Sequence, residues 1–149
     1  MRIERWLIIV LSIALLASMA IAQKPSRRYI GPSMPSPDAR PFSEAVLVGD
    51  TLYLSGDIGL EEGNKVPADA KTEAKLVLDS MEKTLADAGM TLDDLVFVQV
   101  FCSDVAHYAD FNTVYRTRFK KEFPARAFIG AGKLLFGARF EVQGIAVKR

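Results

Sequence analysis

The chain has 149 residues, half of them hydrophobic, and its 19 basic and 18 acidic residues give a net charge of +1 at pH 7. A neutral chain without a basic run lacks the electrostatic footprint of a nucleic-acid-binding protein, so we expect no nucleic-acid partner. Cys102 is the only cysteine, which excludes an internal disulfide, and a single histidine leaves too few ligands for a zinc or Cys–His catalytic site. We therefore predict no metal site.

The N-terminal residues 1–22 have the pattern of a secretory signal peptide. A mildly positive start precedes an apolar run over residues 6–19, and Ala20-Ile21-Ala22 supplies the small residues of a cleavage site. The alternative is an uncleaved membrane anchor, because residues 6–22 number 17, near the lower limit for crossing a bilayer of about 30 Å. We predict that the protein is exported, periplasmic or secreted, with no membrane contact after cleavage.

Residues 23–40 are predicted to form an irregular lead before a single domain. Prolines at positions 25, 32, 35 and 37, with Pro41 directly after them, disfavour both a helix and a central strand. Beyond the lead, short apolar runs at residues 45–48 and 51–54 flank Gly49-Asp50. Two such runs separated by a two-residue turn predict a β-hairpin.

The rest of the chain alternates between helical and extended patterns. Apolar residues recur at three- and four-residue steps in two stretches, which predicts helices over residues 67–88 and 110–120. Apolar runs predict strands over residues 96–102, 125–131 and 139–147. The order β-β-α-β-α-β-β predicts an α+β domain with one mixed sheet and two helices on one face. Because two helices leave the other sheet face bare, we expect a homo-oligomer with ligand clefts between its subunits.

Arg126 is a candidate anchor for a small organic acid. It follows Pro124, whose fixed φ stiffens the backbone, and it begins an apolar strand. Its guanidinium is permanently charged and planar, so it can bind a carboxylate with two hydrogen bonds. The alternatives are a solvated surface arginine and a structural ion pair.

Several short motifs, in this order and spacing, resemble the RidA/YjgF/UK114 family of reactive-intermediate deaminases. They are Pro41-Phe42-Ser43, Gly49-Asp50, Ser55-Gly56, Phe123-Pro124-Ala125-Arg126 and the closing residues 141–147. The resemblance covers residues 41–149. It implies a chorismate-mutase-like fold, a homotrimer with clefts at its subunit interfaces, and hydrolysis of small 2-imino acids to 2-oxo acids and ammonia without a cofactor or metal.

The resemblance also assigns roles to single residues. Arg126 stands at the carboxylate-binding arginine of the family, and Ser55 and Gly56 stand at a turn that lies against the ligand. Asn112 matches an asparagine near the site. Two positions depart from the family, since Phe42 replaces a tyrosine and Phe128 replaces a cysteine or small residue. We expect all six of these residues to line a pocket for a small carboxylate.

Gln143 is the departure with the largest consequence, because the resemblance places a water-activating glutamate at this position. An amide can orient water through its carbonyl oxygen but cannot take up a proton. Glu141 lies two residues earlier on the same strand face, about 6.6–6.8 Å away along the strand, and is a possible substitute. We predict a weakened deaminase that uses Arg126 and Gln143; the alternative is a protein that binds a small carboxylate without catalysis.

Overall fold

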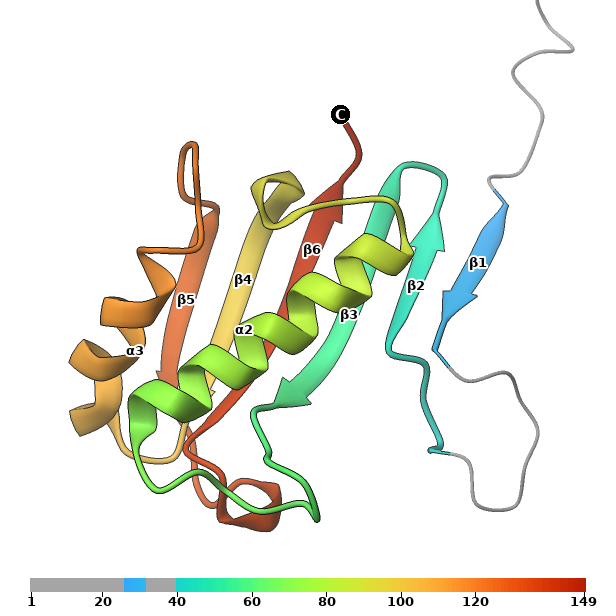
Figure 1. Cartoon of the computed structure of the whole chain (residues 1–149). Helices are drawn as coiled ribbons and strands as arrows, with labels where there is room; N and C mark the ends of the chain where they lie inside the picture. Colours follow the sequence, from blue (N-terminus) through green and yellow to red (C-terminus); the bar gives the residue numbers. More distant parts are fainter. Residues whose placement is uncertain (1–25, 32–39) are drawn as a thin grey trace, which may run out of the picture.

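A computed structural model describes residues 26–31 and 40–149 (Figure 1). The predicted signal peptide lies outside these residues. The described strands are β1 (Arg27–Ile30), β2 (Ala45–Val48), β3 (Thr51–Ile58), β4 (Leu95–Cys102), β5 (Ala125–Gly130) and β6 (Phe140–Val147). The helices are α2 (Ala70–Asp87) and α3 (Tyr108–Tyr115), with short 3₁₀ turns η1 (Leu92–Asp94), η2 (Val105–His107) and η3 (Leu135–Gly137). Within the described ranges, no helix has the length and apolar character needed to span a bilayer.

The strands form one six-stranded mixed sheet in the order β1-β2-β3-β6-β4-β5. The β4–β5 pair is parallel, and the other neighbours run antiparallel. Helices α2 and α3 lie on the same side of the sheet (Figure 1). The prediction of an α+β domain with two helices on one face is confirmed.

The predicted hairpin is present and its second strand is longer than expected. Val48 pairs with Thr51, so Gly49 and Asp50 form a two-residue turn. Gly49 has a φ of 58°, a left-handed conformation that glycine adopts without steric strain. Strand β3 continues to Ile58, and its register against β6 shifts between Leu54 and Asp57. This irregularity matters for the site, because Ser55 and Gly56 lie within it.

The prediction of an irregular lead is wrong for residues 27–30, which form strand β1. This strand is antiparallel to β2 and occupies the edge of the sheet. None of its four residues is proline, and an edge strand needs hydrogen bonds on one side only. The surrounding prolines therefore exclude a central strand but leave room for a short edge strand.

Both helices are shorter than predicted. Helix α2 begins after Asp69, whose Oδ1 accepts a hydrogen bond of 2.9 Å from the backbone nitrogen of Thr72. This N-cap satisfies a free backbone donor and fixes the start of the helix three residues later than the apolar pattern suggested. Helix α3 ends at Tyr115 rather than at residue 120.

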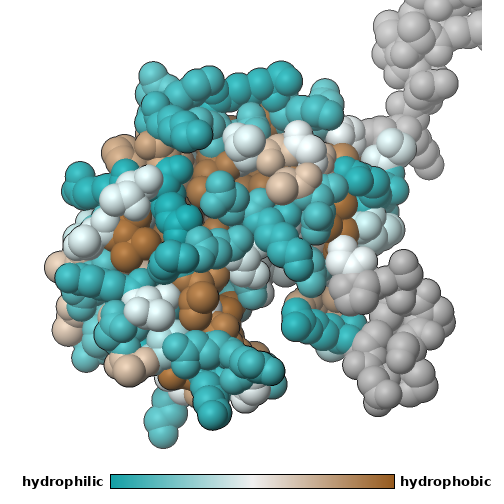
Figure 2. Space-filling view, in the orientation of Figure 1, coloured by the Kyte–Doolittle hydropathy of each residue, from teal (hydrophilic) through white to brown (hydrophobic). Residues whose placement is uncertain are grey.

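The core lies between the sheet and the helices. The predicted apolar stripe of α2, which includes Val77, Leu78 and Leu85, is fully buried against the sheet. Cys102 is also buried and donates a hydrogen bond to the Asp104 carbonyl. The outward side of the helix layer is mostly hydrophilic, with apolar patches between the helices (Figure 2).

Glu73 is a charged residue inside this core, and it joins α2 to the start of β6. Its carboxylate accepts hydrogen bonds from the backbone nitrogens of Arg139 (2.5 Å) and Phe140 (2.9 Å). It also forms an ion pair of 2.7 Å with the Arg139 guanidinium, which donates in turn to the carbonyls of Pro67 and Ala68. A fully buried carboxylate with this many donors is compensated in place, so it fixes the position of β6 relative to α2.

We expect Glu73→Gln to lower the free energy of unfolding by about 1–3 kcal/mol, because one oxygen acceptor is replaced by an amide donor that faces other donors. Chemical denaturation monitored by circular dichroism measures this loss. Glu82→Gln on the same helix is the matched control, since Glu82 is exposed and its ion pair with Arg118 spans 3.6 Å. An equal effect of the two substitutions would contradict the structural role of Glu73.

Candidate functional site

A cavity with a volume of about 740 Å³ lies beside strand β3. We call it the β3 cavity. Among the predicted site residues, it is lined by Phe42, Ser55 and Gly56. The rest of its lining is Arg40, Glu44, Leu54, Asp57, Ile58, Leu60, Glu61, Asn64, Ser80, Met81, Thr84, Leu135, Phe136 and Glu141.

Ser55 and Gly56 shape this cavity through the irregular part of β3. The Ser55 hydroxyl donates a hydrogen bond of 2.6 Å to the Ser43 carbonyl, which ties β3 to the segment that carries Phe42. A Cβ atom placed on Gly56 would overlap Oε1 of Glu141. Gly56 is therefore required for the Glu141 carboxylate to lie against the strand.

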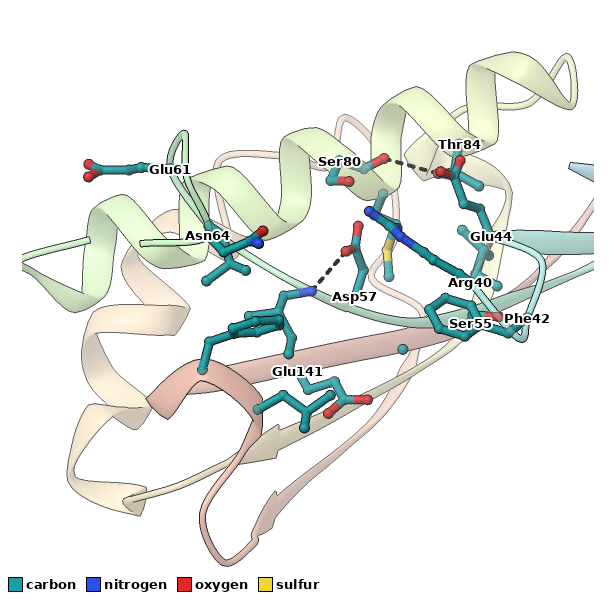
Figure 3. Close-up of a pocket in the computed structure, with 17 residues that line it drawn as sticks. Arg40, Phe42, Glu44, Ser55, Asp57, Glu61, Asn64, Ser80, Thr84 and Glu141 are labelled. Carbon is teal, nitrogen blue, oxygen red and sulfur yellow. Dashed lines mark hydrogen bonds between the residues drawn. The ribbon is translucent and has the colours of Figure 1, made fainter. Parts of the chain in front are cut away.

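The walls of the β3 cavity are rich in acidic groups. Glu44, Asp57, Glu61 and Glu141 contribute four carboxylates, and Arg40 contributes one positive charge. Figure 3 shows Arg40, Asp57 and Glu141 extending from three different segments around this space. Within the described ranges, no cluster of three or more His, Cys, Asp or Glu side chains has the geometry to hold a metal ion.

Arg126 and Asn112 lie in a second, smaller cavity of about 160 Å³, which we call the Arg126 cavity. Its lining is Asn112, Tyr115, Arg116, Phe123, Pro124 and Arg126. One terminal nitrogen of Arg126 donates a hydrogen bond of 2.7 Å to Oδ1 of Asn112. The guanidinium carbon lies 4.4 Å from the ring centroid of Tyr115, a stacked cation–π contact.

The other terminal nitrogen of Arg126, Nη1, is buried and has no hydrogen-bond partner within residues 26–31 and 40–149. Over the same residues no carboxylate forms an ion pair with Arg126; the Asn112 amide that it contacts is neutral. The side chain is thus neither a fully solvated arginine nor half of an internal ion pair. It keeps its charge and one donor for another group.

Tyr115 is positioned to support the guanidinium rather than to transfer protons. Desolvation by burial raises the pKa of its hydroxyl to about 12, although the charge of Arg126 acts in the opposite direction. The hydroxyl therefore stays neutral at physiological pH. Tyr115 is 4% exposed, and its contact with Arg126 was not predicted from the sequence.

Phe128 and Gln143 line neither of these two cavities. The Phe128 ring packs edge-to-face against Tyr108 and Phe111, with centroid distances of 4.9 and 5.7 Å, on the helix side of the sheet. Gln143 lies on the opposite face of the sheet, where its amide nitrogen donates a hydrogen bond of 3.1 Å to Gln99. Within one chain, neither residue therefore joins the other candidate residues in a cavity, and the pocket role of Phe128 and the catalytic role of Gln143 stay predictions.

Comparison with known proteins places this geometry in a family. The profile described as Endoribonuclease L-PSP matches residues 34–148. The chain belongs to the RidA/YjgF family. Its RidA relatives include the 2-iminobutanoate/2-iminopropanoate deaminases of Capra hircus and Homo sapiens. They are 35% and 34% identical over 124 residues, which cover 82% of this chain and 90% of each relative.

Solved structures of RidA-family proteins have the same fold. Yeast Mmf1 aligns with a TM-score of 0.74 at 30% identity, covering 83% of this chain and all of Mmf1. Escherichia coli TdcF with bound serine aligns with a TM-score of 0.74 at 25% identity, covering 82% of this chain and 99% of TdcF. The predicted RidA fold is therefore confirmed.

In one chain, the structure separates the predicted site residues of this RidA protein into two groups. Phe42, Ser55 and Gly56 belong to the β3 cavity, and Asn112 and Arg126 belong to the Arg126 cavity. Sequence analysis missed Arg40, Leu135 and Phe136 as cavity residues. It ranked Glu141 below Gln143, although only Glu141 reaches the β3 cavity. Because side chains alternate along a strand, the sequence predicted that Glu141 and Gln143 share one face of β6. It did not predict which of the two side chains lines a cavity.

Proposed function

We propose that this protein hydrolyses 2-imino acids to 2-oxo acids and ammonia. The observation that carries the proposal is the state of Arg126, a half-buried cation held by Asn112 and Tyr115 with one donor free. A carboxylate is the partner that completes the fork of a guanidinium. The deaminase names of relatives at about 35% identity support the choice of a 2-imino acid, as does the serine bound to TdcF.

We propose further that the active form is a homotrimer in which a neighbouring copy brings its Arg126 cavity against the β3 cavity. The sheet face away from the helices exposes large apolar residues, including Tyr53 (50%), Val96 (47%) and Val147 (38%). Exposed apolar side chains on a sheet face favour association, because contact with another copy removes them from water. The trimer also gives each site both its cation and its carboxylate, which lie in separate cavities of one chain.

Glu141, rather than Gln143, takes the role of the proton-transferring group in this proposal. Glu141 lines the β3 cavity beside Gly56, whereas the Gln143 amide is engaged by Gln99 on the neighbouring strand. A carboxylate can accept a proton and return it, which an amide cannot do. The departure at position 143 then leaves the acid–base chemistry intact.

The reaction needs binding, addition of water and loss of ammonia. Arg126 binds the substrate carboxylate and orients the imine. Water forms a bond to the imine carbon, the electron pair of the C=N double bond moves to nitrogen, and Glu141 accepts a proton from the water. The protonated Glu141 delivers that proton to nitrogen. The product of this step is a carbinolamine. Glu141 then takes the remaining hydroxyl proton and passes it to nitrogen, the C–N bond breaks with its electron pair leaving on ammonia, and the O–H electron pair forms the carbonyl of the 2-oxo acid.

The test is release of ammonia from freshly generated 2-iminopropanoate and 2-iminobutanoate. Free imines hydrolyse in water, so the rate must be compared with buffer alone and with heat-denatured protein. Turnover above both backgrounds supports the proposal. If 2-oxo acids raise the melting temperature of the protein but no imine is turned over, the protein is a carboxylate-binding member of the family, which is the alternative from sequence analysis.

We also propose that residues 1–22 direct export and are then removed. Expression of the full chain followed by cell fractionation tests this. The expected result is a processed protein outside the cytoplasm whose N-terminal residue, identified by mass spectrometry, is Gln23. A membrane-bound product that retains residues 1–22 would instead indicate an uncleaved anchor.

A further inference from the structure

Three large apolar side chains lie at the exposed wall of the β3 cavity, and the proposed chemistry does not use them. Phe42, Leu135 and Phe136 line the cavity and are 51%, 69% and 61% exposed. We call these residues the apolar lip. Phe42 precedes β2, while the other two residues come from η3, so segments distant in sequence supply exposed apolar side chains to the same cavity.

The backbone conformation at Phe136 is unusual for a bulky residue. Phe136 has a φ of 59°, and the other described non-glycine residue with a positive φ is Asn64. Asparagine tolerates the left-handed region, whereas a bulky residue such as phenylalanine is strained there. A bulky ring kept at a strained position, exposed to water and next to a cavity points to a role for the ring itself.

The cavity is larger than a three- or four-carbon acid requires. Its volume of about 740 Å³ lies within the range of about 300–1,000 Å³ that is typical of sites for drug-sized ligands. Its interior is also partly apolar, since Ile58, Leu60 and Met81 contribute to the lining. If the substrate carboxylate is held by Arg126, the substrate side chain is free to occupy this space.

We propose that the apolar lip selects 2-imino acids with bulky apolar side chains, derived from amino acids such as phenylalanine, methionine or leucine. This inference rests on the proposed function and specifies its substrate class. Contact between the substrate side chain and the lip removes apolar surface of both from water, which favours large apolar substrates. The carboxylates of Glu44, Asp57 and Glu61 in the same walls repel acidic side chains, so aspartate- and glutamate-derived imines are excluded.

The substrate comparison uses imines generated by a D-amino-acid oxidase from D-alanine, D-methionine and D-phenylalanine, with decay followed by stopped-flow absorbance. Carbon 2 of an imine is planar, so the configuration of the parent amino acid does not matter. We expect kcat/KM for the phenylalanine- and methionine-derived imines to exceed that for the alanine-derived imine by at least about tenfold, since one methylene in an apolar pocket is worth about 10–200-fold.

The variant that tests the lip is Phe136→Asn, because asparagine accepts the left-handed backbone and removes only the ring. We expect it to lower kcat/KM for the phenylalanine-derived imine by about tenfold and to change that for the alanine-derived imine by less than about twofold. Val105→Ala is the matched control, since Val105 is 58% exposed and lines neither cavity. It is expected to leave both values unchanged.

Three results would overturn the inference: equal kcat/KM for large and small imines, an equal loss on both in Phe136→Asn, or a change of oligomeric state in that variant by sedimentation velocity. The last result would identify the lip as a subunit contact. If no imine is hydrolysed, the proposed function fails, and calorimetric binding of phenylpyruvate and pyruvate decides the inference. Tighter binding of phenylpyruvate that is lost in Phe136→Asn supports it, and equal affinity overturns it.

Discussion

Arg126→Ala is expected to lower kcat/KM for 2-imino acids by roughly 10²–10⁴-fold. The charge-assisted hydrogen bond from the free terminal nitrogen to the substrate carboxylate is lost together with the attraction between the two charges, and truncating one partner of such a charge pair costs about 2–5 kcal/mol. Arg126→Lys should lose less, about 10–10²-fold, because it keeps the charge but not the planar guanidinium that stacks on Tyr115. Steady-state kinetics with freshly generated 2-iminobutanoate measures both values.

The control for Arg126 must separate loss of the anchor from loss of structure. Lys121→Ala removes an exposed positive charge from the segment that leads into β5 and should leave kcat/KM within about twofold of wild type, as for most surface substitutions. Melting curves of both variants report folding. Arg126→Ala with normal stability and undiminished kcat/KM would show that the carboxylate is bound elsewhere.

The elements that the sequence predicts well are those fixed by local chemistry. The hairpin around Gly49 follows from a turn residue that tolerates positive φ, and α2 follows from an apolar stripe over five turns. Strand β1 was missed because its stability comes from pairing with β2, more than ten residues away, and no local pattern encodes that pairing. After the end of α3 at Tyr115, the chain continues in turns, and the Phe119 ring packs against Tyr115 with a centroid distance of 4.7 Å.

The candidate site likewise combines features that depend on the local sequence with features that depend on contacts between distant segments. From the sequence, Arg126 was a candidate anchor whose rigidity came from Pro124 alone, and an internal ion pair stayed open as an alternative. In the structure, Asn112 and Tyr115 on α3 hold the guanidinium, through contacts that no spacing in the sequence shows. The β3 irregularity between Leu54 and Asp57, which brings Gly56 beside Glu141, is also a property of the assembled sheet.

These long-range features explain why a single chain carries a divided site. The acid and the cation that the chemistry needs are each preorganised in their own cavity, one beside β3 and one between α3 and β5. Arg126 and Glu141, which carry the proposed binding and proton transfer, lie in different cavities of one chain. Catalysis and assembly are therefore linked in the proposed mechanism, so substitutions that dissociate the oligomer should abolish turnover while leaving each subunit folded.

Glu141→Gln is expected to lower kcat by about 10²–10⁴-fold with KM changed by less than a few-fold, because the amide keeps the size of the side chain but cannot accept the proton of the attacking water. Steady-state kinetics with freshly generated 2-iminobutanoate measures both constants. An unchanged kcat in the variant would assign proton transfer to another group.

The companion substitutions are at Gln143, two residues along the same face of β6. Gln143→Ala is expected to leave kcat within a few-fold of wild type, because this amide contacts Gln99 and lines neither cavity. Gln143→Glu should give no gain, and it places a second carboxylate beside Glu141 on the same strand face. A large gain in kcat from Gln143→Glu, together with a small effect of Glu141→Gln, would return the catalytic role to position 143 and show that the native site is a weakened deaminase.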